Sequence, residues 1–199
     1  NIAMQALLAQ KEAALSAMEP LERIENTIDE LEKTRDEADN YIKLYDSYTA
    51  LSASYDTLIA QTIAGNDAID TKEQAEAFLE AEGNAEYLQL KAQMASCLTQ
   101  LNALGGYDPA LYEAQKTAKA SAEAGLARVD AQLAAIGMTR ESFRETLAQL
   151  RRGVAQLDAQ IAQLEEASAQ LEAGKITIDQ AYRQLRATQS EKTMQITSG

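Results

Sequence analysis

The sequence predicts an all-α protein, an elongated antiparallel two-helix coiled-coil stalk with a four-helix bundle head. The first observation is composition, because 199 residues with only 2 Pro, 9 Gly and no Trp are typical of long helices and coiled coils. The second is the 3–4 spacing of apolar residues over long stretches. The third is a set of helix-ending and helix-capping sequences that divide the chain into a few elements.

These sequences place helices at 2–64, 71–82, 85–104, 109–136 and from 140 onward. In "TIAGNDAIDTKEQ", Gly65 ends the first helix and Asp70 or Thr71 caps the second. In "EAEGNAEYL", Gly83 and Asn84 take the same two roles.

Two further turns carry more complete signals. In "LGGYDPALY", Gly105 ends a helix, Asp108 caps the next, and Pro109 takes its first position. Tyr107 and Tyr112 are spaced to meet as a hydrophobic staple across this cap. In "AIGMTRESF", Gly137, Thr139 and the pair Met138 and Phe143 repeat the arrangement.

The last helix shows the clearest heptad repeat, which requires a partner helix. One set of positions contains Leu147, Val154, Ile161, Ser168, Lys175 and Tyr182, and the other contains Phe143, Leu150, Leu157, Leu164, Leu171, Ile178 and Leu185. We expect residues 2–40 to pair with 161–190 in antiparallel fashion. Gly174 lies within the repeat, and because the register continues past it, we expect a local kink or short break there.

From Tyr41 onward the first helix carries a second apolar seam, which predicts more than one neighbour. Those neighbours are expected to be the helices at 85–104 and 109–136. The domain prediction is therefore a stalk made of 1–40 and 161–199, with a helical bundle head at 41–160.

A net charge of −13 makes nucleic acid and anionic membrane surfaces unfavourable partners. No stretch approaches the roughly 20 apolar residues of a membrane span. A chain that begins at Asn1 is expected to be an excised or processed piece of a longer protein.

We expect no catalytic site, no cofactor and no metal site. The chain has no histidine, and its glycines follow no predicted strand, which argues against phosphate-binding loops. Neighbouring carboxylates such as Glu165 and Glu166 point in different directions on a helix. Cys97 lies on an apolar face and is interpreted as a buried small residue. The alternative, a reactive thiol, has only Lys91 as a nearby base.

Tyrosines are the most suggestive residues for binding, because Tyr combines an apolar body with a polar tip. Tyr41, Tyr45, Tyr48 and Tyr55 follow a helical spacing that core packing alone explains. Tyr107 and Tyr112 are the candidates for contact with a protein partner. The alternative is a staple that merely fixes the turn.

"AQLDAQIAQLEEASAQLEAGKITIDQAYRQL" resembles the extracytoplasmic coiled-coil insertions of FtsX-like or MacB-like ABC-transporter permeases of Gram-positive bacteria. The matching residues are Gln156-Leu157, Gln163-Leu164, Gln170-Leu171, Gly174-Lys175 and Gln184-Leu185. YhgE/Pip-like membrane proteins carry similar repeats. The resemblance covers about 30 residues and includes no catalytic residue, and the Ala-Gly repeat of such insertions is not sustained here.

The resemblance implies a non-enzymatic domain on the extracytoplasmic face of the cell membrane. Such a domain contacts a protein partner or substrate and couples that contact to the membrane part through flanking segments. The alternative is a soluble, cytoplasmic coiled-coil scaffold without a membrane link. The sequence leaves the partner and the oligomeric state open.

Overall fold

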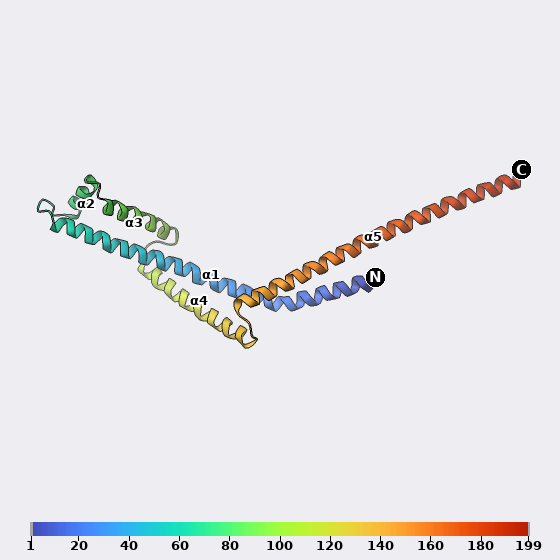
Figure 1. Cartoon of the computed structure of the whole chain (residues 1–199), viewed down its shortest axis with the longest axis horizontal. Coiled ribbons are helices and arrows are strands. Elements are labelled where there is room, and N and C mark those ends of the chain that lie inside the picture. The colour runs from blue at the N-terminus through green and yellow to red at the C-terminus, as the bar shows by residue number, and fades with distance from the viewer. Residues whose placement is uncertain (1, 199) are drawn as a thin grey trace. The chain divides into compact units, whose positions relative to one another are not determined.

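The computed structural model describes residues 2–198, which form five helices joined by short turns (Figure 1). The helices are α1 (Ile2–Ala64), α2 (Lys72–Ala81), α3 (Ala85–Ala103), α4 (Pro109–Ala135) and α5 (Arg140–Ser198). No strand occurs in residues 2–198. The all-α prediction is confirmed, and each predicted helix end lies within one residue of the observed end.

The predicted caps explain this agreement. Thr71 accepts a hydrogen bond from the backbone N–H of Gln74 at 3.2 Å, and the Gln74 side chain accepts one from the N–H of Thr71 at 3.3 Å, so both halves of a capping box are present. Asp108 caps α4 through the N–H of Ala110 at 2.9 Å, with Pro109 at the start of the helix. Gly137 has a φ of 74°, a left-handed conformation that ends the α4 segment at little steric cost.

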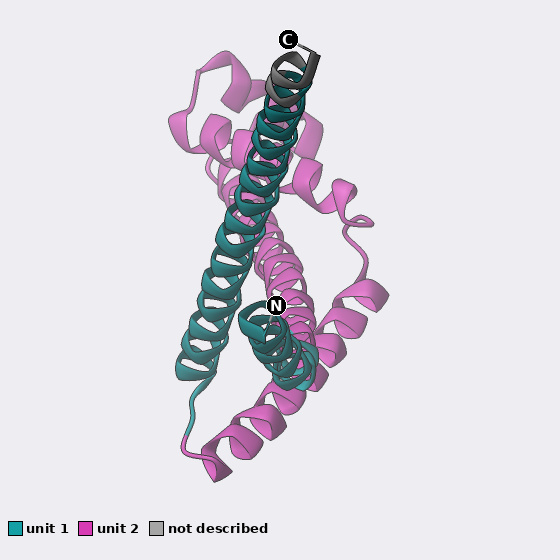
Figure 2. Cartoon of the chain, turned by 90° about the vertical axis from the view of Figure 1, so that its right-hand side faces the viewer, with its two compact units in different colours: residues 1–25, 138–199 teal, residues 26–137 magenta. Residues whose placement is uncertain are grey.

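The chain divides into two compact units, coloured separately in Figure 2. Unit 1 contains residues 1–25 and 138–199, and unit 2 contains residues 26–137. These limits differ from residues 40 and 160, where the sequence analysis placed the ends of stalk and head. The predicted domain division stays a prediction.

Unit 1 is an antiparallel helix pair. Lys11 lies 2.6 Å from Asp158, and Arg151 lies 2.9 Å from Glu25, so positions ascend on α1 as they descend on α5. Met4 lines a small groove with residues of α5 that include Glu172. The segment of α1 in this unit therefore pairs with residues near 151–172, earlier in α5 than the expected 161–190. The spacing of apolar residues repeats every heptad and does not select between such registers.

The expectation at Gly174 was a local kink or a short break. Helix α5 runs through Gly174 as one helix, so the short break is absent. A glycine inside a helix raises the free energy of that helix by only about 1 kcal/mol relative to alanine. Helix formation by the residues on both sides is favourable enough to offset this cost. Thr177, three residues after Gly174, donates its hydroxyl to the carbonyl of Ala173 at 2.9 Å, as mid-helix threonines do.

Unit 2 confirms that α3 and α4 are neighbours of α1. One core cluster joins α1, α2 and α3 around Tyr55, Leu79 and Tyr87. A second joins α1 and α3 around Tyr41 and Leu101, with residues of α4 packed against it. Farther along, α4 approaches α1 closely at Gly125, where an added Cβ would lie 2.9 Å from the side chain of Leu31.

Candidate functional site

A group of tyrosines in unit 2 contains the closest ring stacking found among the described residues. We define the tyrosine cluster as Tyr41, Tyr45, Tyr48, Tyr107 and Tyr112. The ring centroid of Tyr45 lies 4.3 Å from that of Tyr107 and 4.1 Å from that of Tyr112, and both pairs are nearly parallel. Two rings stacked this closely on one ring must lie on its opposite faces. Tyr45 is therefore sandwiched between the other two.

Three hydroxyl groups of the cluster form hydrogen bonds with a backbone carbonyl, a carboxylate and a threonine hydroxyl. Tyr41 donates to the carbonyl of Gly106 at 2.8 Å, and Tyr112 donates to the Asp46 carboxylate at 2.8 Å. The hydroxyls of Tyr107 and Thr49 are 2.7 Å apart. These bonds tie the turn between α3 and α4 to α1, so the aromatic surface is rigid rather than adaptable.

The electrostatics of the cluster favour neutral phenols. Burial raises the pKa of Tyr45, and the nearby tyrosine hydroxyls add to the effect. The pKa of Tyr112 is raised because its hydroxyl donates to the Asp46 carboxylate, which disfavours a second negative charge there. A phenol with a raised pKa stays neutral and is a poor nucleophile at neutral pH, so Tyr45 and Tyr112 suit packing and contact rather than proton transfer.

Both predicted contact residues are in this cluster, and each makes structural contacts. Tyr107 is 36% exposed and Tyr112 is half-buried, so an edge of the stack faces solvent. Tyr107 and Tyr112 were expected to contact each other as a hydrophobic staple. Each instead stacks on Tyr45, whose ring lies between theirs. Asp46 and Thr49, which anchor the outer hydroxyls, were missed. Only their positions one and four residues beyond Tyr45 on the helix could have suggested them.

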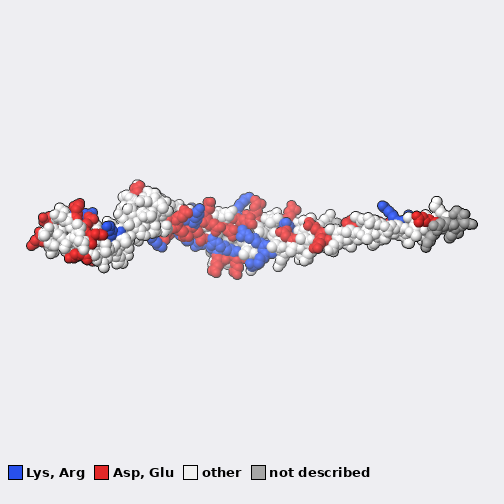
Figure 3. Space-filling model, turned by 90° about the horizontal axis from the view of Figure 1, so that it is seen from above, with Lys and Arg blue, Asp and Glu red and all other residues white. Residues whose placement is uncertain are grey.

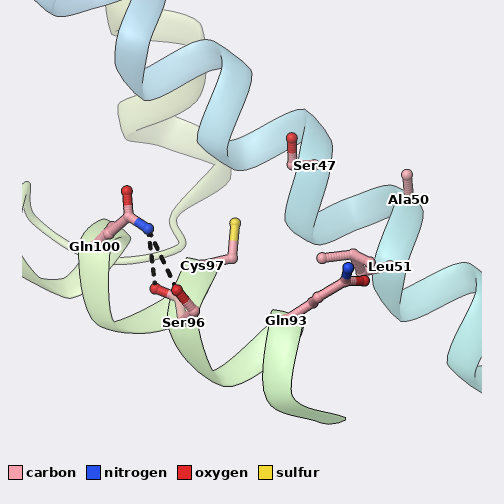
Figure 4. A pocket seen from close by; sticks show the side chains of 7 residues that line it. All are labelled: Ser47, Ala50, Leu51, Gln93, Ser96, Cys97 and Gln100. Carbon is pink, nitrogen blue, oxygen red and sulfur yellow. Dashed lines mark hydrogen bonds between the residues drawn. The ribbon is translucent and has the colours of Figure 1, made fainter. Parts of the chain in front are cut away.

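Cys97 is buried, as predicted, beside an open groove of 480 Å³ between α1 and α3 (Figure 4). Its thiol donates to the carbonyl of Leu44 at 3.1 Å, and burial raises the pKa of the thiol. Leu51 also lines the groove, together with small and amide side chains that include Ser47 and Gln100. These properties favour a packed thiol over a reactive one.

Charged residues form local ion pairs. Figure 3 shows acidic and basic side chains interspersed in the middle part of the face it displays. Asp39 lies 2.8 Å from Lys119 and 2.7 Å from Lys43, and these ammonium groups lower its pKa to about 2. Among the described residues there is no group of three or more metal-ligating side chains, and no polar or charged residue is buried.

The C-terminal part of α5 presents a second candidate surface. We define the α5 seam as Leu171, Ile178, Tyr182 and Leu185, whose exposed fractions are 75%, 69%, 57% and 57%. The spacing places all four on one side of the helix. No helix in the described range is long and apolar enough to cross a bilayer.

No protein-family model, curated protein or solved structure matches the chain.

Proposed function

We propose that the chain is a non-enzymatic coiled-coil domain of an ABC-type permease, placed outside the cell membrane. It contacts a protein partner or substrate and couples that contact to the membrane part. The membrane setting comes from the resemblance of the Gln-Leu and Gly-Lys repeats at 156–185 to permease insertions. The contact role rests on surfaces that belong to this chain.

The antiparallel pairing in unit 1 is the observation that carries the proposal. The contacts between Lys11 and Asp158, and between Arg151 and Glu25, mean that the chain enters along one helix and returns along another toward the same end. A domain arranged in this way can be inserted between two segments of a larger protein. Two membrane helices are one such pair of segments.

The proposed contact site is the tyrosine cluster. Aromatic residues are enriched where proteins bind one another, and rigid rings lose little conformational freedom on binding. Tyr107 is the contact residue proposed first, because it combines an exposed edge with a fixed position.

The membrane setting is tested by reading the gene on both sides of this segment. The proposal predicts an apolar stretch of about 20 residues on each side. Polar flanking sequences would contradict it and leave the alternative, a soluble scaffold. The exposed α5 seam favours that alternative specifically, since an uncovered heptad face is what an assembly helix offers to another chain.

A further inference from the structure

We propose that a groove between α1 and α3 is the docking site for one helix of a protein partner, whose contacting face carries large apolar side chains and no charge. This inference goes beyond the proposed function, because it concerns a surface other than the tyrosine cluster and does not depend on the membrane setting. We define the α1–α3 groove by its lining residues, which lie beside Cys97 and are Ser47, Ala50 and Leu51 of α1 with Gln93, Ser96 and Gln100 of α3 (Figure 4).

The first argument is the absence of charge around the groove. Residues 47–55 of α1 contain no charged side chain between Asp46 and Asp56, and residues 92–107 contain none between Lys91 and Asp108. In a chain with 25% charged residues, stretches of this length are expected to hold several. Depletion of charged residues is typical of the centre of protein interfaces. The partner's face is uncharged as well, since a charge buried against neutral groups is not compensated.

The second argument is the direction of the groove. In α3 the lining positions are 93, 96, 97 and 100, and in α1 they are 47, 50 and 51. Positions three and four apart lie on one side of a helix, so each helix borders the groove with a stripe of side chains. A hollow bordered by two such stripes extends along the helices and fits a third helix packed against both.

The third argument is that small side chains leave the hollow unfilled. Ser47, Ala50 and Ser96 are exposed and small, and the groove has a volume of 480 Å³. Pockets of about 300–1,000 Å³ accommodate whole small ligands, so this volume accepts several large side chains. Leu51 and the sulfur of Cys97 offer them apolar surface. Leucine or methionine residues three and four positions apart on a partner helix are complementary to this lining.

The polar side chains of the groove are able to orient the partner. The Gln100 amide donates to the carbonyl and the hydroxyl oxygen of Ser96 at 3.5 Å, which is long for a hydrogen bond, so exchanging these bonds for one to a partner costs little. The Cys97 thiol already donates to the carbonyl of Leu44. Serine hydroxyls and glutamine amides are neutral, so they fix a partner helix without ion pairs.

A second copy of this chain fits the groove less well than a separate partner. A two-fold pair places the same surface on both sides of its interface, so a hollow lined by small side chains would face an identical hollow. Each copy also carries a net charge of −13, which opposes the approach of another copy.

A fluorescein-labelled helical peptide is the probe for this site. It contains about 20 residues of alanine and glutamine, with leucines three and four positions apart on one face and Glu–Lys pairs on the opposite face to support the helix. Two control peptides carry lysine or glutamate in place of the leucines. Fluorescence anisotropy with the complete chain at up to about 500 µM measures binding of all three.

The leucine peptide is expected to bind with a dissociation constant on the order of 10⁻⁵ M, because a single helix buries less than the roughly 1,200 Å² of a stable interface. The lysine and glutamate peptides should bind at least about tenfold more weakly. No binding of the leucine peptide, or equal binding of a charged peptide, overturns the proposal.

Matched arginine substitutions locate the site. Ser96→Arg puts a long charged side chain into the groove and should weaken binding of the leucine peptide at least about tenfold, as should Ala50→Arg from the α1 side. Ala95→Arg adds the same charge at an exposed position that does not line the groove, and should change the constant by less than about twofold. All three residues are exposed, so circular dichroism should show an intact fold. Equal effects of Ser96→Arg and Ala95→Arg would overturn the assignment.

Sedimentation equilibrium of the chain without peptide tests the other occupant. The proposal predicts no association through the groove at up to about 500 µM. A dimer that Ser96→Arg abolishes and Ala95→Arg leaves intact would assign the groove to a second copy, and the separate partner would be ruled out as its occupant.

Discussion

Helix α4 and the C-terminal part of α5 both carry apolar residues three and four positions apart. Those residues are buried in α4 and exposed in α5. In α4, Leu126, Val129 and Leu133 are 3%, 9% and 2% exposed. In α5, Ile178, Tyr182 and Leu185 follow an equivalent pattern but are more than half exposed. A periodic apolar face shows that a helix needs a neighbour, but not that the neighbour belongs to the same chain.

The difference also separates two kinds of candidate surface. The tyrosine cluster of unit 2 is preorganised, because stacking and hydrogen bonds hold Tyr45 between Tyr107 and Tyr112. The α5 seam is organised only by its own helix. Isolated helices are marginally stable in water, so residues 171–185 are expected to open more readily than the tyrosine cluster.

The largest expected effect is a matched leucine truncation. Leu133→Ala should lower the free energy of unfolding by about 2–5 kcal/mol, because it leaves a cavity at a fully buried site. Leu185→Ala should change it by less than about 0.5 kcal/mol in the dilute monomer. Urea unfolding at low protein concentration measures both. Similar losses in the two variants would mean that the α5 seam is covered within the monomer.

A substitution at the tyrosine cluster tests its rigidity. Tyr107→Ser should lower the free energy of unfolding by about 1–2 kcal/mol, because it removes ring stacking on Tyr45 and the hydroxyl contact with Thr49. Tyr107→Phe keeps the ring and should cost less than about 1 kcal/mol. Thermal or urea unfolding gives both values.

The same Tyr107→Ser variant separates a staple from a contact residue when the activity of the full-length protein is measured. Loss of activity in proportion to lost stability indicates a staple. Intact folding with lost activity indicates contact with a partner. Intact folding with intact activity removes Tyr107 from the proposed contact site.

Replacing glycine by alanine should lower stability in a turn with positive φ and raise it inside a helix. Gly137→Ala should destabilise by about 1 kcal/mol, because a φ of 74° is unfavourable for a residue with a Cβ. Gly174→Ala should raise the helix content of α5 by removing a cost of about 1 kcal/mol, since an added Cβ there meets no atom within 4 Å. Circular dichroism and unfolding curves report the two changes. A loss of helix in Gly174→Ala would contradict the continuous α5.

The smallest expected effect is pH-dependent and concerns Asp39. Its pKa is lowered to about 2 by Lys119 and Lys43, so its ion pairs stabilise the fold above the ordinary carboxyl pKa near 3.8 and lose that effect as pH falls toward about 2. Asp39→Asn should therefore lower the urea midpoint slightly at pH 6, and the difference should shrink between pH 4 and pH 2. A difference that is constant with pH would show that charge is not its cause.

The helix ends could be predicted because their causes are local. The Thr71 and Gln74 capping box, and the Asp108-Pro109 start of α4, depend on residues a few positions apart. The burial of Cys97 and the neighbours of α1 also followed from one-sided apolar patterns.

The remaining features depend on contacts distant in sequence. The position of Tyr45 between Tyr107 and Tyr112 requires the turn between α3 and α4 to return to α1, which spacing along either helix does not encode. The register of unit 1 is marked by ion pairs such as Lys11 with Asp158, while the heptad pattern fits several registers. At Gly174 the sequence left a kink or a short break open, and the helix continues through it without a break.

The central claim is that the apolar residues at 171–185 are exposed, whereas those of α4 are covered by other described residues. Amide hydrogen exchange of the dilute chain, followed by mass spectrometry, tests it most directly. The account predicts rapid exchange at 171–185 and strong protection of α4. Protection of 171–185 equal to that of α4 would contradict the account.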